Sequence, residues 1–265
     1  MDDLGVTLEA LTAAVSIAQA RRGSPLARVG KGGADFATDV DTAIERAILD
    51  VIRGARPDDA VQGEEYGLSG PADAERRWLV DPLCGTLNYA SGSPTYGINI
   101  ALTKGDEVLV AAVAEPAADV VYVADGHTAW QRRDGVDEPL RPSASSCLVE
   151  VHLETHDPDN QGFSSTRYLR SSTFEVVSAR YLGSGLPLAW VASGQRAGFV
   201  IPDRRQASVH FTAGIGLCRA AGCILSDLRG GPLHLGGDGI VAAADAATHA
   251  LLMAGIAEQF ATPEA

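Results

Sequence analysis

The stretch WLVDPLCGTLN, at residues 78–88, joins an apolar segment to a carboxyl group and a thiol. Trp78 to Val80 has the composition of a buried strand, and that strand leads into Asp81 and Pro82. Cys84 follows closely after the carboxylate. We therefore take Asp81 and Cys84 as the first candidate site residues and work outward from them.

Apolar periodicity predicts helices and strands in blocks on both sides of this stretch. The expected helices lie near residues 4–21, 41–52, 186–194, 213–221 and 246–260. The expected strands lie near residues 60–62, 78–80, 96–103, 108–114, 120–124, 147–153, 224–228 and 239–244. The strands at 96–124 indicate a β-meander, and the glycine-rich connector at 23–33 indicates a loop. Blocks of helices and strands are typical of layered α+β packing.

The length of 265 residues allows one large domain or two closely packed halves. We expect an N-terminal α+β half at residues 1–145, with the meander and the Cys84 motif. A C-terminal α/β half at residues 146–265 would contain His210. The composition never shifts enough to mark a flexible linker, so we expect the halves to pack as one unit.

The net charge of −13, from 21 basic and 34 acidic residues, argues against nucleic acid as a partner. The first five residues, MDDLG, do not begin a signal peptide, and no apolar run approaches the length of a membrane span. We therefore expect a cytoplasmic protein with no membrane partner. The four cysteines form no CxxC pair, which favours reduced thiols; Cys147, Cys218 and Cys223 are expected to pack in the interior.

Several motifs, in order along the chain, resemble the inositol monophosphatase family. They are ATDVD at residues 37–41, GEE at 63–65, the stretch at 78–88, RYLGS at 180–184, and GIGLCRAAG at 214–222 with Asp227 beyond it. The resemblance spans nearly the whole chain. It implies the αβαβα sandwich of that family, a fold that is often dimeric.

The resemblance also implies a magnesium site, because hard divalent ions prefer clustered oxygen ligands. By position, Glu64 and Asp81 keep ligand roles, and the Leu83 carbonyl can serve as another ligand. Thr86 and Asp41 match the pair that orients the attacking water.

Two positions depart from the family pattern. Cys84 replaces the second aspartate of the motif, and Val209-His210 replaces a later tryptophan–aspartate pair. Thiols and imidazoles are poor magnesium ligands, so these changes argue against the family's chemistry.

In the family, the positions of Asp81, Cys84 and His210 converge on one ion, so the thiol and the imidazole should lie close together. One interpretation is a catalytic Cys–His dyad with Asp81 orienting the imidazole. The amides of Gly85 and Thr86 would then lower the thiol pKa and bind an oxyanion. Two alternatives remain: a Cys–His–Asp transition-metal site, most simply for zinc, and an inactive site with packed side chains.

Other carboxylates have smaller expected roles. Asp41 and Glu64 could anchor Thr86 and its loop, or they could be inherited without a role. Glu115 and Asp203 are reserve candidates for orienting His210.

A metal-free site of this kind resembles the off-loading Dieckmann cyclases of tetramate and pyridone pathways. That resemblance implies no cofactor and a carrier-protein-bound thioester as substrate, released as a tetramic acid through a Cys84 acyl-enzyme. His210 would be the base. The alternatives are a magnesium-dependent phosphomonoesterase, with Glu64, Asp81, Thr86 and Asp41 around one remaining ion, and a non-catalytic homologue. A homodimer is possible in each case.

Overall fold

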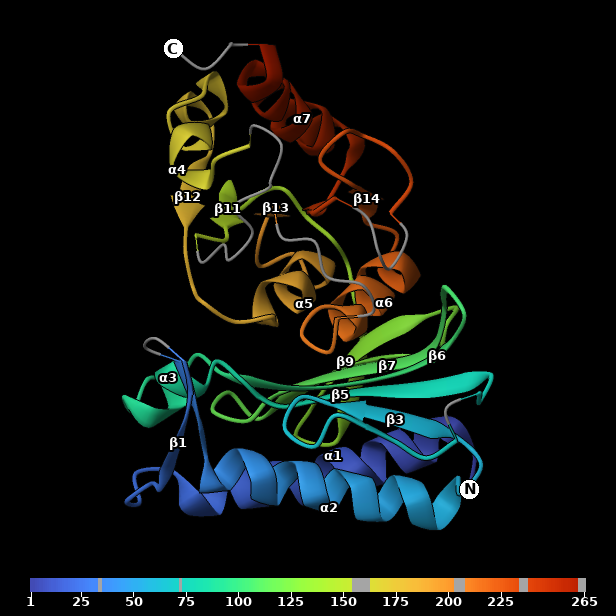
Figure 1. The fold of residues 1–265 in the computed structure, drawn as a ribbon. Coiled ribbons are helices and arrows are strands. Elements are labelled where there is room, and N and C mark those ends of the chain that lie inside the picture. The colour runs from blue at the N-terminus through green and yellow to red at the C-terminus, as the bar shows by residue number, and fades with distance from the viewer. Residues whose placement is uncertain (33–34, 72, 154–162, 203–207, 234–237, 262–265) are drawn as a thin grey trace. The chain divides into compact units, whose positions relative to one another are not determined.

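The computed structural model describes residues 1–265 except 33–34, 72, 154–162, 203–207, 234–237 and 262–265 (Figure 1). The chain divides into two compact units. Unit 1 comprises Met1–Pro139, Ser184–Leu186 and Ser208–Leu217. Unit 2 comprises Leu140–Gly183, Pro187–Ala207 and Cys218–Ala265. Every candidate site residue described below belongs to unit 1.

Unit 1 is built on an eight-stranded sheet with the order β10-β9-β8-β7-β6-β5-β3-β4. Its strands are β3 (Ala60–Gly63), β4 (Leu68–Ser69), β5 (Arg76–Cys84), β6 (Gly97–Lys104), β7 (Glu107–Glu115), β8 (Val120–Ala124), β9 (Ala129–Arg133) and β10 (Val136–Pro139). The strands from β5 to β10 are antiparallel neighbours, which confirms the predicted meander and extends it by β5, β9 and β10. β5 also pairs in parallel with β3.

Two helices of unit 1, α1 (Asp3–Arg21) and α2 (Asp39–Ala55), lie side by side along one face of this sheet (Figure 1). The inner face of α2 carries Ile44, Ile48 and Ile52, all fully buried in the core of unit 1. Their spacing matches the helical period, so one stripe of the helix removes apolar surface from water. Both predicted helices are confirmed.

The connector before α2 contains a β-hairpin, β1 (Arg28–Gly32) with β2 (Asp35–Thr38), where the sequence predicted only a loop. α2 begins at Asp39 because Thr38 caps it. The Thr38 side chain accepts hydrogen bonds from the amides of Val40 and Asp41, and the Asp41 side chain accepts one from the Thr38 amide. This reciprocal capping box fixes both Asp41 and the end of the hairpin.

Unit 2 contains a five-stranded sheet with the order β12-β11-β13-β15-β14. Its strands are β11 (Leu148–Val151), β12 (Ser178–Arg180), β13 (Gly198–Ile201), β14 (Ile224–Ser226) and β15 (Ile240–Ala243). α7 (Ala246–Ala261) packs against this sheet and contacts α4 (Ser165–Tyr168) and the 3-10 helix η1 (Ser172–Glu175). The predicted helices at 186–194 and 213–221 are α5 (Leu186–Ala192) and α6 (Thr212–Ala221).

The cysteines outside the motif differ in burial. Cys218 is fully buried, as expected. Cys223 is only half-buried, and Cys147 is exposed with a positive φ of 52°. The expectation that Cys147 packs in the interior is wrong, because the residue lies in the turn before β11 and not within the strand.

Within the described part of the chain, no helix combines the length and the apolar character that crossing a membrane requires.

Candidate active site

The site forms where β5 ends. Asp81 pairs with Asn99 of β6, and Cys84 pairs with Gly97 after a shift in register between the two. Gly85 then turns the chain into the short helix α3 (Thr86–Ala90) with a φ of 98°, a conformation that suits glycine. The irregular end of β5 places Asp81 and Cys84 side by side at the edge of the unit 1 core.

His210 reaches the same place from the segment before α6. Its amide donates to the Ser208 hydroxyl at 3.2 Å, and its carbonyl accepts a hydrogen bond from the Asn99 side chain at 3.1 Å. Asn99 therefore ties the His210 backbone directly to β6.

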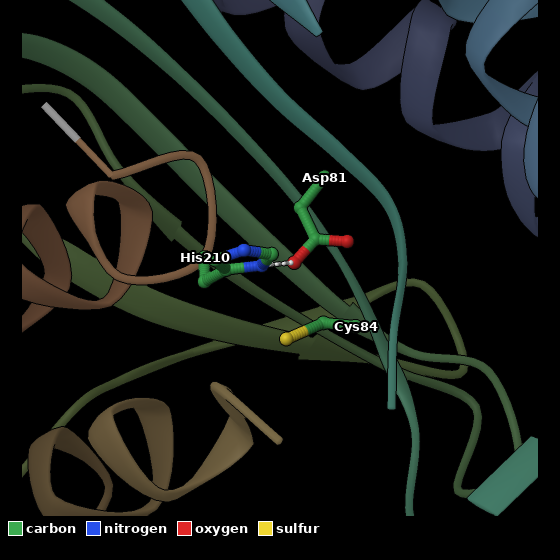
Figure 2. A group of neighbouring side chains, drawn as sticks. All are labelled: Asp81, Cys84 and His210. Carbon is green, nitrogen blue, oxygen red and sulfur yellow. Dashed lines mark hydrogen bonds and ion pairs between the residues drawn. The ribbon is translucent and has the colours of Figure 1, made fainter. Parts of the chain in front are cut away.

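The three side chains converge on one another (Figure 2). His210 Nδ1 lies 2.7 Å from Asp81 Oδ2, and potential ligand atoms of Asp81, Cys84 and His210 all lie within 4.8 Å of one another. The structure thus brings together the three residues that the family resemblance placed around one point. Of the reserve candidates, Glu115 Oε2 instead accepts a hydrogen bond from the Tyr122 hydroxyl, and Asp203 lies outside the described residues.

The Cys84 thiol has little access to water, with 6% of the residue exposed. Burial raises its pKa well above the ordinary value, and the neighbouring Asp81 carboxylate raises it further. The expectation of a lowered thiol pKa is therefore wrong. Its physical reason is that burial and a nearby negative charge both disfavour the thiolate.

The amide that reaches the sulfur belongs to Gly185. Its N–H donates to Cys84 Sγ at 3.0 Å, and the Ser184 hydroxyl donates to the Cys84 carbonyl at 3.1 Å. A Cβ atom at Gly185 would lie 2.4 Å from the His210 carbonyl and 3.2 Å from Sγ. Gly185 was missed in the sequence, although the RYLGS motif ends directly before it.

Glu64 is a second carboxylate beside this group, with Oε2 4.0 Å from His210 Nδ1. Burial and then the negative charge of Asp81 raise the pKa of Glu64 to about 8, against the opposing effects of His210 and Lys31. Asp81 behaves differently: burial favours its neutral form, but the charge of His210 and the hydrogen bonds with His210, Cys84 and Glu64 together keep its pKa below the ordinary value.

Lys31 of the β1–β2 hairpin also reaches the site. Its Nζ lies 2.8 Å from Glu64 Oε1 and 2.6 Å from Glu65 Oε1. The chain has only two lysines, Lys31 and Lys104, and Lys31 lies in a run of glycines. A single lysine in a glycine-rich segment was the feature of the sequence that could have indicated a role for Lys31 at the site.

Glu45 supports the same loop from α2. Its carboxylate accepts the amides of Glu65 and Tyr66 at 2.8 and 2.9 Å. A Cβ atom at Gly63 would lie 1.8 Å from Glu45 Oε1, so the GEE motif requires glycine to let this carboxylate approach. Glu45 was also missed in the sequence.

Thr86 and Asp41 form a buried pair. Thr86 Oγ1 donates to Asp41 Oδ1 at 2.8 Å and also lies 3.1 Å from the Leu83 carbonyl. The Thr38 amide and hydroxyl donate to the other Asp41 oxygen. Burial raises the pKa of Asp41, although these hydrogen bonds oppose the shift.

The chain belongs to the inositol monophosphatase family, whose model, described as "Inositol monophosphatase family", matches residues 3–261. It is 36% identical to the inositol-1-monophosphatase of Rhizobium meliloti over 213 residues, 78% of each chain. It is 34% identical to the Nus factor SuhB of Escherichia coli over 216 residues, 80% of this chain and 79% of that protein.

Comparison with solved structures gives the same fold. The extragenic suppressor protein suhB of Bartonella henselae matches with a TM-score of 0.84 and 26% identity, over 95% of this chain and 97% of that one. The expected α+β layered sandwich of the inositol monophosphatase type is confirmed.

The relatives overturn the predicted activity. Those compared above are an inositol monophosphatase and SuhB proteins, which favours the phosphomonoesterase alternative over a cysteine-dependent Dieckmann cyclase. The cyclase assignment, its carrier-bound thioester substrate and its place in tetramic acid biosynthesis are wrong. They rested on a nucleophilic thiol, and burial disfavours the thiolate of Cys84.

The family implies a magnesium ion, and the residues of the site differ in how well their donor atoms suit that ion. Glu64, Asp81 and the Leu83 carbonyl offer oxygen atoms, and two crowded carboxylates suit a hard cation. This part of the site fits magnesium. Cys84 and His210 offer sulfur and nitrogen, which magnesium binds poorly, so that part does not fit it.

Proposed function

We propose that this protein is a metal-dependent phosphomonoesterase that releases inorganic phosphate from a phosphate monoester of a small polyol. Family membership and the inositol-1-monophosphatase relatives support the reaction and the substrate class. The single observation that carries the proposal is the hydrogen bond between Thr86 and Asp41, because it prepares a hydroxyl group to hold a water molecule.

In the proposed mechanism, the Thr86 hydroxyl donates its proton in a hydrogen bond to Asp41, so the Thr86 oxygen is left to accept a hydrogen bond from water. The lone pair of that water then points away from Thr86 and toward the phosphorus. Attack forms the new P–O bond and breaks the ester P–O bond, and the leaving oxygen takes a proton from solvent water, which yields the alcohol and phosphate. The water proton passes toward Thr86 and Asp41, whose raised pKa suits it to receive a proton.

Glu64, Asp81 and the Leu83 carbonyl would hold the hard cation of the family. When bound, that cation would supply charge stabilisation for the phosphate oxygens. Lys31 lies against Glu64 and Glu65 and offsets part of their negative charge. This reduces the repulsion that an anionic substrate meets in a strongly acidic protein.

The test is phosphate release from inositol 1-phosphate and from a panel of other polyol phosphates, with each of several divalent ions. Thr86→Ala should lower kcat by about 100-fold or more, because the water loses its orienting group. Thr86→Ser retains the hydroxyl and should retain most of the activity. Thr12→Ala, on an exposed face of α1, is the matched control and should leave kcat unchanged.

Two results would reject the proposal. One is the absence of phosphate release with every ion and substrate tested from a folded protein. The other is a Thr86→Ala enzyme that is as active as the Thr12→Ala control.

A further inference from the structure

The cluster of Asp81, Cys84 and His210 offers one oxygen, one sulfur and one nitrogen donor. Their ligand atoms lie within 4.8 Å of one another, and the cluster is the one such group of histidine, cysteine and acidic side chains found among the described residues. Magnesium prefers oxygen alone, whereas zinc binds this mixture of donors readily. The donor set therefore favours a different class of metal from the one that suits the neighbouring carboxylates.

We propose that Asp81, Cys84 and His210 bind a zinc-class ion, and that the Asp81 carboxylate is shared between this ion and the hard-cation position formed with Glu64 and the Leu83 carbonyl. The inference concerns which ion the site holds, and it stands whether or not the proposed phosphatase substrate is correct.

The present geometry needs only a small expansion to accept this ion. His210 Nδ1 and Asp81 Oδ2 form a hydrogen bond of 2.7 Å, with one proton between them. A tetrahedral zinc ion, with bonds of about 2.0 to 2.3 Å, holds its ligand atoms roughly 3.3 to 3.8 Å apart. The ion takes the place of the shared proton, so the two side chains move apart by about 1 Å or less. The thiol proton and the shared proton are both released to solvent on binding.

The surrounding hydrogen bonds suit a metal-bound thiolate. The Gly185 amide already donates to Cys84 Sγ at 3.0 Å, and an N–H bond of this kind stabilises the negative sulfur. Asn99 holds the carbonyl of His210 and Ser208 holds its amide, which limits the movement of that ligand. Such outer contacts orient metal ligands and strengthen binding.

A fourth ligand has a place to bind. Asp81 is fully buried, but 23% of the His210 side chain is exposed, so one side of the cluster remains open to water. Glu64 Oε2 lies 4.0 Å from His210 Nδ1. Three protein ligands with an open fourth position are typical of zinc sites that act on substrates.

The test measures metal binding without substrate. The 265-residue chain is stripped of metal, and its zinc and magnesium affinities are measured by chelator competition. Cobalt(II) is then added as a spectroscopic substitute, because a cysteine ligand produces a thiolate-to-cobalt charge-transfer band. We expect one zinc ion per chain, the charge-transfer band, and protection of Cys84 from iodoacetamide by zinc.

Cys84→Ser should weaken zinc binding by about 100-fold or more and abolish the charge-transfer band. Cys147→Ser removes an exposed thiol outside the cluster and should change neither property. The double variant Cys84→Asp/His210→Asp makes every donor in the cluster an oxygen, and it should bind magnesium more tightly and zinc more weakly than the parent protein. Circular dichroism establishes that each variant is folded.

Three results would overturn the inference: no zinc bound by the folded parent protein, equal zinc affinity for Cys84→Ser and Cys147→Ser, or alkylation of Cys84 that zinc does not slow. Phosphate release is assayed separately. Zinc binding without phosphate release would reject only the proposed function, and phosphate release with magnesium but no zinc binding would reject only the metal inference.

Discussion

The Nδ1 atom of His210 lies 2.7 Å from the Oδ2 atom of Asp81, although 129 positions separate the two residues in the sequence. Asp81 lies near the end of β5, and His210 lies just before α6. The contact brings a buried carboxylate and an imidazole together beside a thiol that is held by Gly185. The imidazole and the thiol are the two groups that distinguish this site from one built only of carboxylates.

Asp81→Asn should lower zinc affinity by about 100-fold, because it removes a charged ligand from the cluster. The Asn side-chain oxygen can still accept the Leu83 amide, which now donates to Asp81 Oδ1 at 3.2 Å, so we expect the variant to fold. Chelator competition measures the affinity. Asp58→Asn, at an exposed position, is the control, and equal affinities for the two variants would contradict the prediction.

Gly185→Ala should destabilise the protein by about 1 to 3 kcal/mol, because its Cβ atom would press on the His210 carbonyl and the Cys84 sulfur. We also expect weaker zinc binding. Gly54→Ala is the matched control: a Cβ atom there meets no neighbour, and alanine favours the helix. Urea unfolding measures both variants. A Gly185→Ala protein as stable as Gly54→Ala would show that the close approach is not a constraint.

Glu45→Ala should lower the free energy of unfolding by about 1 to 3 kcal/mol, because the amides of Glu65 and Tyr66 lose their hydrogen-bond acceptor in a partly buried loop. Glu45→Gln keeps one oxygen acceptor and should be milder. Thermal unfolding of the two variants gives the order. The prediction fails if Gln is as damaging as Ala, because the role would then depend on the charge and not on the hydrogen bonds.

Asp3 should make stability depend on pH. Burial acts to raise its pKa, but the hydrogen bonds and the positive charges of Arg76 and Arg56 together outweigh burial, so the pKa of Asp3 in the folded protein lies below the ordinary value of an aspartate. A lowered folded pKa stabilises the native state above the unfolded pKa, and that contribution is lost as the pH falls through the folded value.

Asp3→Asn should therefore destabilise the protein by up to about 1 kcal/mol at pH 7, allowing for the partial exposure of the carboxylate. The difference should shrink as the pH falls below about 4. Urea unfolding of the parent, Asp3→Asn and Asp58→Asn proteins at pH 7 and pH 3 tests this. A difference that stays constant with pH would contradict it.

Much of the fold could be predicted because its signals are local. The apolar stripe of α2 and the alternation in the strands of the meander depend on neighbours in the sequence. The β1–β2 hairpin was not predicted, because the glycines of β1 obscure the alternation of apolar and polar residues that indicates a strand. Lys31 of the site lies in this strand. β13, around Phe199, was missed because a short apolar run has no periodicity of its own.

The site was partly predictable. Asp81 and Cys84 are close in the sequence, and the family motifs supplied the place of His210. Gly185 and Glu45 could not be found in this way, because their roles are hydrogen bonds to segments far away in the chain.

The amino-acid order by itself determined the helices, the meander, the family and the exchange of two family aspartates for Cys84 and His210. Only the tertiary structure decided how the thiol behaves, because burial and the charge of Asp81 raise its pKa where the local motif predicted the opposite. Solvation and charge at a site depend on every segment that packs around it, and a local stretch of sequence contains only one of those segments.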